Sequence, residues 1–316
     1  MRWLPAAVAA ACFAAAGPAQ ADEFFSIRDE NPLVRGYYLP LPSDTRAADG
    51  ATFSATLAIS NTTNVDQHGS EHDFIDGESD ALRLTYENAL SSAWRYRVTV
   101  PVIRDSGGFL DTFIEDWHRW FGFQQGYRPY YPKNQLDYSY TGLSHLVLNH
   151  DATSLGDIAG DLGWFARDDA RHTLSFWAGV KAPTGSIADL TSDGAWDGAL
   201  WAHYALHLSR WQVGAEMGLA QPFGDELFAG HAHQTSAFGR VALTRDLGDS
   251  WALRAQLDGQ TRRVDDSRLR LTGPSLQLSA GATRRVWRRW RIEMGFAEDA
   301  AVNTAPDITF FLGIRN

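Results

Sequence analysis

The sequence has one cysteine, Cys12, and lacks the features of several protein classes. No run of 18 or more apolar residues follows the first twenty or so positions, so no transmembrane helix is predicted. Basic residues are in the minority, with 28 Lys and Arg against 38 Asp and Glu, which argues against nucleic acid as a partner. The lack of a second thiol argues against disulfides and cysteine-based metal sites.

The first 21 residues have the three parts of a secretory signal peptide. Arg2 supplies the positive charge, a short apolar run extends from Leu4 to Ala16, and Ala19-Gln20-Ala21 provides the small residues of a cleavage site. Cys12 lies in the middle of the apolar run, whereas a lipoprotein cysteine would follow it. We therefore predict export to the periplasm with simple cleavage after Ala21.

Aromatic residues are abundant, and four Trp residues recur in one context. Each follows a short polar turn and begins a run in which apolar and polar residues alternate: Trp94, Trp211, Trp251 and Trp290. This alternation gives a strand one apolar and one polar face, as in a barrel whose outer surface meets lipid. Because tryptophan prefers the headgroup level of a bilayer, we predict that these four residues mark the periplasmic rim.

The predicted fold is all-β: a transmembrane antiparallel up-and-down barrel of about 12 strands. The alternating runs, many of them about nine to eleven residues long and so able to cross a bilayer when tilted, lie near 51–60, 79–90, 94–103, 155–167, 172–183, 196–208, 211–221, 234–246, 251–262, 269–286, 290–297 and 307–315. Short turns alternate with long connections, as periplasmic turns and extracellular loops do. The chain is thus divided into a signal peptide (1–21), a periplasmic N-terminal segment (22–50) and an outer-membrane barrel (51–316).

Residues 105–123 break this alternation. Apolar residues recur there at three- and four-residue steps, which is the spacing of one helical face: Phe109, Leu110, Phe113, Ile114, Trp117, Trp120 and Phe121. We predict a short amphipathic helix in the second extracellular loop that plugs or gates the barrel. The alternatives are one wall of a site for an apolar ligand and a lipid contact outside the barrel. The segment 135–149 is expected to form a hairpin beyond the membrane.

The same region carries a family resemblance. Gly107-Gly108-Phe109-Leu110-Asp111, Ile114-Glu115-Asp116-Trp117-His118 and Phe121-Gly122 resemble an uncharacterised Gram-negative outer-membrane β-barrel family, domain of unknown function 3187. Ser154-Leu155-Gly156-Asp157-Ile158 resembles the strand start that this family shares with related small barrels. The resemblance covers the mature chain and implies an outer-membrane location. It implies no catalytic residues.

Two groups of histidines are candidate sites. His68-Gly69-Ser70 with His72 and Asp73 is similar to the His and Ser placement of outer-membrane lipid hydrolases, but without an orienting group a solvated loop is favoured. His231-Ala232-His233 offers two imidazoles, which make an incomplete metal site. We therefore predict no catalytic residue, no cofactor and no metal.

Charged residues on the polar faces of the strands are expected to line the lumen: Arg83, Glu87, Arg95, Arg97, Glu216, Arg240, Arg254, Asp258, Arg291 and Glu293. They indicate either a salt-bridged interior or a polar conduction path. The preferred function is a passive channel or uptake protein for small solutes, apolar ones included. The alternatives are a non-transporting structural or adhesion barrel and an outer-membrane lipid-modifying enzyme. Expected partners are outer-membrane lipid, the barrel-assembly machinery and a small solute.

Overall fold

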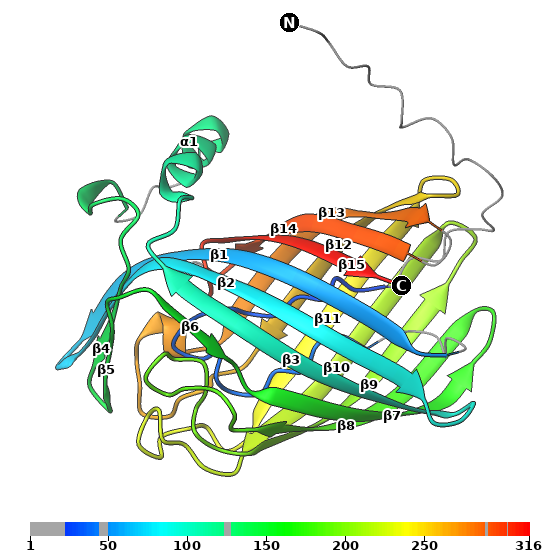
Figure 1. Ribbon diagram of the computed structural model, residues 1–316, viewed down its shortest axis with the longest axis horizontal. Coiled ribbons are helices and arrows are strands. Elements are labelled where there is room, and N and C mark those ends of the chain that lie inside the picture. Colours follow the sequence, from blue (N-terminus) through cyan, green and yellow to red (C-terminus); the bar gives the residue numbers. More distant parts are fainter. Residues whose placement is uncertain (1–22, 44–49, 123–127, 288–289, 302) are drawn as a thin grey trace, which may run out of the picture.

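The computed structural model describes residues 23–43, 50–122, 128–287, 290–301 and 303–316, so the predicted signal peptide and its cleavage site at Ala21 lie outside the described residues. Twelve antiparallel strands close into a barrel because the last strand pairs with the first (Figure 1). They are β1 (Thr52–His68), β2 (Glu71–Ala89), β3 (Trp94–Ser106), β7 (Ile158–Asp168), β8 (His172–Ala182), β9 (Asp197–His207), β10 (Trp211–Pro222), β11 (Ser236–Asp246), β12 (Trp251–Gln260), β13 (Ser275–Trp287), β14 (Trp290–Asp299) and β15 (Ile308–Arg315). The predicted all-β, twelve-stranded barrel is confirmed.

Three short strands and two 3-10 turns complete the described elements. β6 (Ala152–Leu155) precedes β7 along the same edge of β3, and both pair with it. β4 (Asp137–Thr141) and β5 (His145–Leu148) form the hairpin expected in 135–149, and β4 pairs with the far end of β2. The 3-10 turns are η1 (Arg128–Tyr130) and η2 (Arg270–Thr272).

The connection between the first two strands differs from the long loop that the sequence predicted. β1 and β2 stay paired from Thr52 opposite Glu87 to His68 opposite Glu71, and only Gly69 and Ser70 form the turn. The outer part of β1, Asn61 to Gln67, is mostly polar on both faces. The alternation that marks a lipid-facing strand is therefore lost, although the backbone pairing continues.

The barrel has two different ends, which we call the turn end and the loop end. Short turns such as 90–93 and 208–210 lie at the turn end, while 107–122, 128–136, 183–196, 223–235 and 261–274 lie at the loop end. Trp94, Trp211 and Trp251 begin their strands at the turn end and are at least one-third exposed, and Trp290 begins β14 there.

The outer wall is apolar. Outward side chains that remain exposed include Leu84, Val98, Leu200, Leu219, Val241, Leu253, Leu278 and Leu312. An exposed apolar band of this kind, with tryptophan at one rim, is the surface of a transmembrane β-barrel. In the part of the chain that the structure describes, no helix is long and apolar enough to cross a membrane.

Helix α1 (Asp111–Phe121) lies outside the lumen, which corrects the prediction that it plugs the barrel (Figure 1). The ring of Phe113 lies 5.6 Å from that of Phe310, and the ring of Trp117 lies 5.9 Å from that of Phe296. Phe310 points away from the lumen because its neighbours Thr309 and Phe311 are the buried, inward residues of β15. The apolar face of the helix thus packs on the outer wall.

The other predicted residues of that face follow the same arrangement. Leu110 and Ile114 are buried in a cluster with Ile308, while Phe109 and Trp120 are exposed. The side chain of Phe121 lies outside the described part of the helix. The spacing predicted the helix and its apolar stripe, but an apolar stripe fits an outer wall as well as a lumen.

Candidate functional site

The lumen is occupied by residues 23–43, which we call the lumenal segment. Nearly every side chain in it is buried, and it forms no strand or helix (Figure 1, dark blue). Glu23 lies beside His207 at the turn end, with 3.4 Å between the carboxylate and Nδ1. Asn31 Nδ2 donates to the carbonyl of Leu271 at the loop end, at 2.6 Å. The segment therefore runs up the barrel, and the prediction that it lies in the periplasm is wrong for these residues.

The segment then turns and comes back down. Beyond the turn at residues 32–36, Tyr38 N donates to Asp197 Oδ2 at 2.7 Å. Further along, Ser43 N donates to Glu216 Oε1, again at 2.7 Å. The segment is thus a hairpin-shaped insertion whose two arms fill the interior of the barrel.

The ten predicted lumen residues all lie on the inner wall. Arg83, Glu87, Arg95, Arg97, Glu216, Arg240 and Arg254 are buried, and Asp258, Arg291 and Glu293 are half-buried. Some of them bind one another, as Arg95 and Glu87 do at 2.6 Å. Others bind the lumenal segment, as Arg83 does through Glu30 at 2.5 Å. The lumenal segment therefore completes the polar interior, although the sequence predicted this segment to lie in the periplasm.

Backbone carbonyls of the segment also serve as acceptors for wall arginines. Arg97 donates from Nη1 to the carbonyl of Pro42 at 2.6 Å and from Nη2 to the carbonyl of Leu41 at 2.8 Å. Its Nε is held by Asp161 Oδ2 at 2.7 Å. Arg240 donates from Nη2 to the carbonyl of Pro40. These contacts tie the descending arm to the wall.

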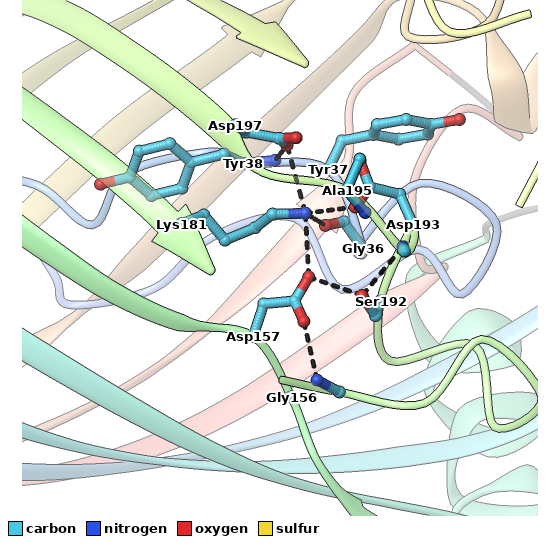
Figure 2. Close-up of polar contacts among 12 residues, drawn as sticks. Gly36, Tyr37, Tyr38, Gly156, Asp157, Lys181, Ser192, Asp193, Ala195 and Asp197 are labelled. Atoms are coloured by element: carbon cyan, nitrogen blue, oxygen red, sulfur yellow. Dashed lines mark hydrogen bonds and ion pairs between the residues drawn. The ribbon is translucent and has the colours of Figure 1, made fainter. Parts of the chain in front are cut away.

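One buried lysine anchors the turn of the segment (Figure 2). The ammonium group of Lys181 lies 2.8 Å from Asp157 Oδ2 and 3.3 Å from Asp197 Oδ2, and it also contacts Asp193. It donates to the carbonyl of Gly36 at 2.8 Å. We call Lys181 and its three aspartates the lysine cluster.

The lysine cluster carries more negative than positive charge. Burial raises the pKa of Asp193, in the loop 183–196, to about 8, although Lys181 opposes the shift. Asp193 Oδ1 accepts from the backbone N–H of Ala195 at 3.1 Å and from Lys181. The docked lumenal segment therefore favours a protonated Asp193.

Loops fold over the loop end and meet the turn of the segment. Leu33, Val34 and Tyr37 lie in one buried apolar cluster with residues of β4, β5 and three loops, among them Tyr138, Leu148, Leu190, Leu227, Phe228 and Leu271. Arg35, beside them, binds Asp105 and donates to the carbonyl of Leu190 at 2.9 Å. The outer entrance is closed by this cluster.

A small cavity remains between the segment and the wall of β3, β7 and β8. Arg28, Tyr38, Arg83, Asp161 and Lys181 are among the residues that line it, and its volume is about 40 Å³. A cavity of that size holds a few water molecules and no larger solute. This cavity is therefore too small to admit a solute.

A row of aromatic side chains covers part of the inner wall, and sequence reasoning missed it. Phe165, Trp177, Trp201 and Phe238, here called the aromatic row, are all buried and packed against Tyr38 and Leu39 of the lumenal segment. The planes of Trp177 and Trp201 are stacked at 5.9 Å and 12°. These residues occupy inward positions where alternation predicts polar side chains, and that mismatch was the available signal.

The two histidine groups lie at the turn between β1 and β2 and in loop 223–235. Gly69 and Ser70 are the turn between β1 and β2, and His68 Nε2 lies 2.9 Å from Arg268 Nη1. His231 and His233 each contact an aspartate through Nδ1, at 3.2 and 2.7 Å. Within the described ranges, no group of three or more His, Cys, Asp or Glu side chains is placed to hold a metal ion.

Comparison with known families identifies the family of this chain. The model of the family described as "Protein of unknown function (DUF3187)" matches residues 2–316. The chain belongs to this family. No curated protein is similar enough in sequence to match it.

Solved structures share the fold of this DUF3187 chain. The COG4313 outer membrane channel from Pseudomonas putida F1 is 17% identical, with a TM-score of 0.57 over 87% of this chain and 97% of that one. The Ralstonia pickettii toluene transporter TbuX is 9% identical, with a TM-score of 0.42 over 85% and 90%. At 17% identity, the similarity to the COG4313 channel shows the barrel fold alone. The TM-score of the TbuX match is too low to support any further conclusion.

Proposed function

We propose that this protein is a passive outer-membrane channel for small solutes and that the lumenal segment is its plug. The observation that carries the proposal is the pairing of the inner wall with the segment. Arg83, Arg97 and Lys181 all direct polar atoms at residues 30–42. A barrel filled by its own wall side chains would need no such insertion, whereas a lumen with a removable filling is a gated pore.

The way the segment is held supports its movement. It pairs with no strand, while the barrel wall is closed by continuous strand pairing from β1 round to β15. Its contacts are hydrogen bonds with wall side chains, the ion pairs of Glu30 with Arg83 and of Arg35 with Asp105, and apolar packing at the turn and on the inner wall. Water can replace those hydrogen bonds once the lumen opens, so the wall charges need not remain unsatisfied. The segment can therefore leave without breaking the barrel.

The surroundings of the barrel follow from its surface. The apolar outer wall and the tryptophan rim fit contact with outer-membrane lipid, with the loop end facing outward. The closing strand β15 is the element that we expect the barrel-assembly machinery to recognise. Helix α1, packed on the outer wall, takes no part in gating in this account.

Liposome swelling tests the proposal with neutral sugars of increasing size. One variant replaces residues 23–43 by a glycine-serine linker of equal length, and a matched control lacks residues 111–121. We expect swelling with small sugars to be much faster for the linker variant than for the intact protein, and unchanged by the loss of α1. Equal silence of the intact protein and the linker variant would overturn the proposal and favour a structural barrel.

A further inference from the structure

Two glycines of the wall make room for the rings of the aromatic row. Gly163 lies opposite Trp177 in the pairing of β7 with β8, and a Cβ at Gly163 would lie 2.6 Å from the Trp177 ring. Gly218 lies between Trp201 and Phe238, and a Cβ there would lie 2.5 Å from both side chains. The two glycines let the rings lie close against the wall.

The lumenal segment covers this row like a bound ligand. Tyr38 and Leu39 pack on the rings, and Trp201 Nε1 donates to Ser43 Oγ at 2.7 Å. The carbonyls of Pro42 and Leu41 accept from Nη1 and Nη2 of Arg97, respectively, and the guanidinium carbon lies 5.3 Å from the centre of the Trp177 ring. Apolar side chains and neutral carbonyl oxygens are thus presented together to one surface.

Departure of the segment exposes a defined set of groups. The stacked pair of Trp177 and Trp201 loses its apolar cover. Arg97 Nη1 and Nη2 lose their carbonyl acceptors, and Trp201 Nε1 loses Ser43. A planar ring can stack on the two Trp rings. A hydrogen-bond acceptor attached to that ring can reach the N–H groups of Arg97 and Trp201.

The charges around the row decide what kind of acceptor fits. Arg95 is paired with Glu87, Arg97 with Asp161, and Arg240 with both Glu216 and Asp258. Three guanidinium groups therefore face four carboxylates. A further anion would add to a negative surplus, whereas a neutral carbonyl takes the arginine N–H groups without adding charge.

We propose that the aromatic row together with Arg97 is a binding site for small planar aromatic solutes that carry a neutral carbonyl acceptor. The lumenal segment acts as the competing internal ligand of this site. The proposal rests on the proposed channel function for its biological role, since a solute reaches the row only when the plug is displaced. The solutes of that channel are then aromatic amides, aromatic ketones and related neutral carbonyl compounds.

Benzamide is the probe, with benzoate as its charged counterpart of the same shape and acetamide as the amide without a ring. Calorimetry measures binding to the detergent-solubilised linker variant described above and to the intact protein. We expect benzamide to bind the linker variant at least about tenfold more tightly than the intact protein, because the segment no longer competes. Benzoate and acetamide should each bind at least about tenfold more weakly than benzamide.

Two further substitutions in the linker variant locate the site. Trp201→Leu and Arg97→Met should each weaken benzamide binding by about tenfold, since one removes the stacking face and the other the donors. Arg83→Met is the matched control, because the partner of Arg83 is Glu30 of the segment, which the linker variant lacks, and it should leave benzamide binding unchanged. If Arg97→Met fails to fold, Trp201→Leu still decides.

The outcomes separate this proposal from the channel proposal. Benzamide binding without any swelling or conductance would uphold the site and overturn the channel. Conductance in the linker variant without benzamide binding, or with benzoate bound more tightly than benzamide, would overturn the site alone. Equal effects of Trp201→Leu and Arg83→Met would also overturn it.

Discussion

Arg35 of the lumenal segment and Asp105 of β3 meet through two parallel contacts. Nη2 lies 2.5 Å from Oδ2 and Nη1 lies 2.8 Å from Oδ1, and both side chains are only 1% exposed. A bidentate pair of this kind fixes the angle as well as the distance between its partners. Because one partner is on the segment and the other on the wall, the pair ties the turn of the segment to the barrel.

Breaking this pair should release the turn of the segment. Arg35→Met leaves Asp105 buried without its cation, which costs about 3 kcal/mol or more when a buried pair loses one member. We expect faster hydrogen exchange in residues 30–38 and more frequent opening in planar bilayers. Arg119→Met removes the exposed pair with Asp116 on α1 and serves as control. It should change neither quantity, and equal effects of the two variants would count against the role of Arg35.

Removing the cation of the lysine cluster should have a similar effect. Lys181→Met leaves Asp157, Asp193 and Asp197 facing one another and takes the donor from Gly36. Mutual repulsion of the carboxylates should loosen loop 183–196 from the segment. The expected readout is protease cleavage within residues 23–43 at concentrations that leave the intact protein uncut. Unchanged protection would show that the turn is held without the lysine cluster.

Opening should depend on pH through Asp193. Burial in the docked state raises the pKa of Asp193 to about 8, whereas an exposed aspartate has an ordinary pKa near 3.8. Between these two pH values the docked state holds a proton that the open state has released. Docking is therefore strongest at low pH and weakens as pH rises between about 4 and 8, beyond which it levels off. Open probability in bilayers should rise across that window, by at most about tenfold per pH unit for one proton.

The matched variant for this prediction is Asp193→Asn, which cannot ionise but retains the acceptor for Lys181. Its open probability should vary less with pH than that of the intact protein. A steeper dependence in Asp193→Asn, or an opening that falls as pH rises from 5 to 8, would contradict the assignment to Asp193.

Close packing of the turn gives a further prediction. A Cβ at Gly36 would lie 2.7 Å from backbone atoms of Ser192 and Asp193. Backbone atoms cannot rotate away as the end of a flexible side chain can. Gly36→Ala should therefore push the segment from the loop and raise conductance while the melting temperature of the barrel stays within a few degrees. Gly160→Ala on β7 meets nothing within 4 Å and should leave conductance unchanged. Equal conductance of the two variants would mean that the turn tolerates displacement.

The sequence predicted those parts of the fold in which side chains alternate. Trp211 to Leu219 and Trp251 to Leu257 alternate because one face meets lipid and the other the lumen, and both strands were placed within a few residues. The outer half of β1 was missed because it leaves the membrane and becomes polar on both faces. Alternation of apolar and polar residues indicates that the two faces of a strand meet different environments. It does not indicate the strand pairing itself.

The site was predictable only in part. Charged inward residues such as Arg97 and Glu216 followed from the strand pattern. The lumenal segment did not, because it has no period and pairs with no strand, and its hydrogen bonds reach residues up to 273 positions away. Its composition held a signal, since Phe24, Phe25, Tyr37 and Tyr38 are unusual in a tail exposed to the periplasm. The helix was found correctly, but its apolar stripe does not say which side of the wall it covers.

Single-channel recording in planar bilayers tests the central claim most directly. The two proteins compared are the intact chain and the variant in which a glycine-serine linker of equal length replaces residues 23–43. The account predicts a low conductance with rare openings for the intact chain and a steady, several-fold larger conductance for the variant. A variant as silent as the intact chain, although folded as a barrel, would contradict the view that the lumenal segment is a plug.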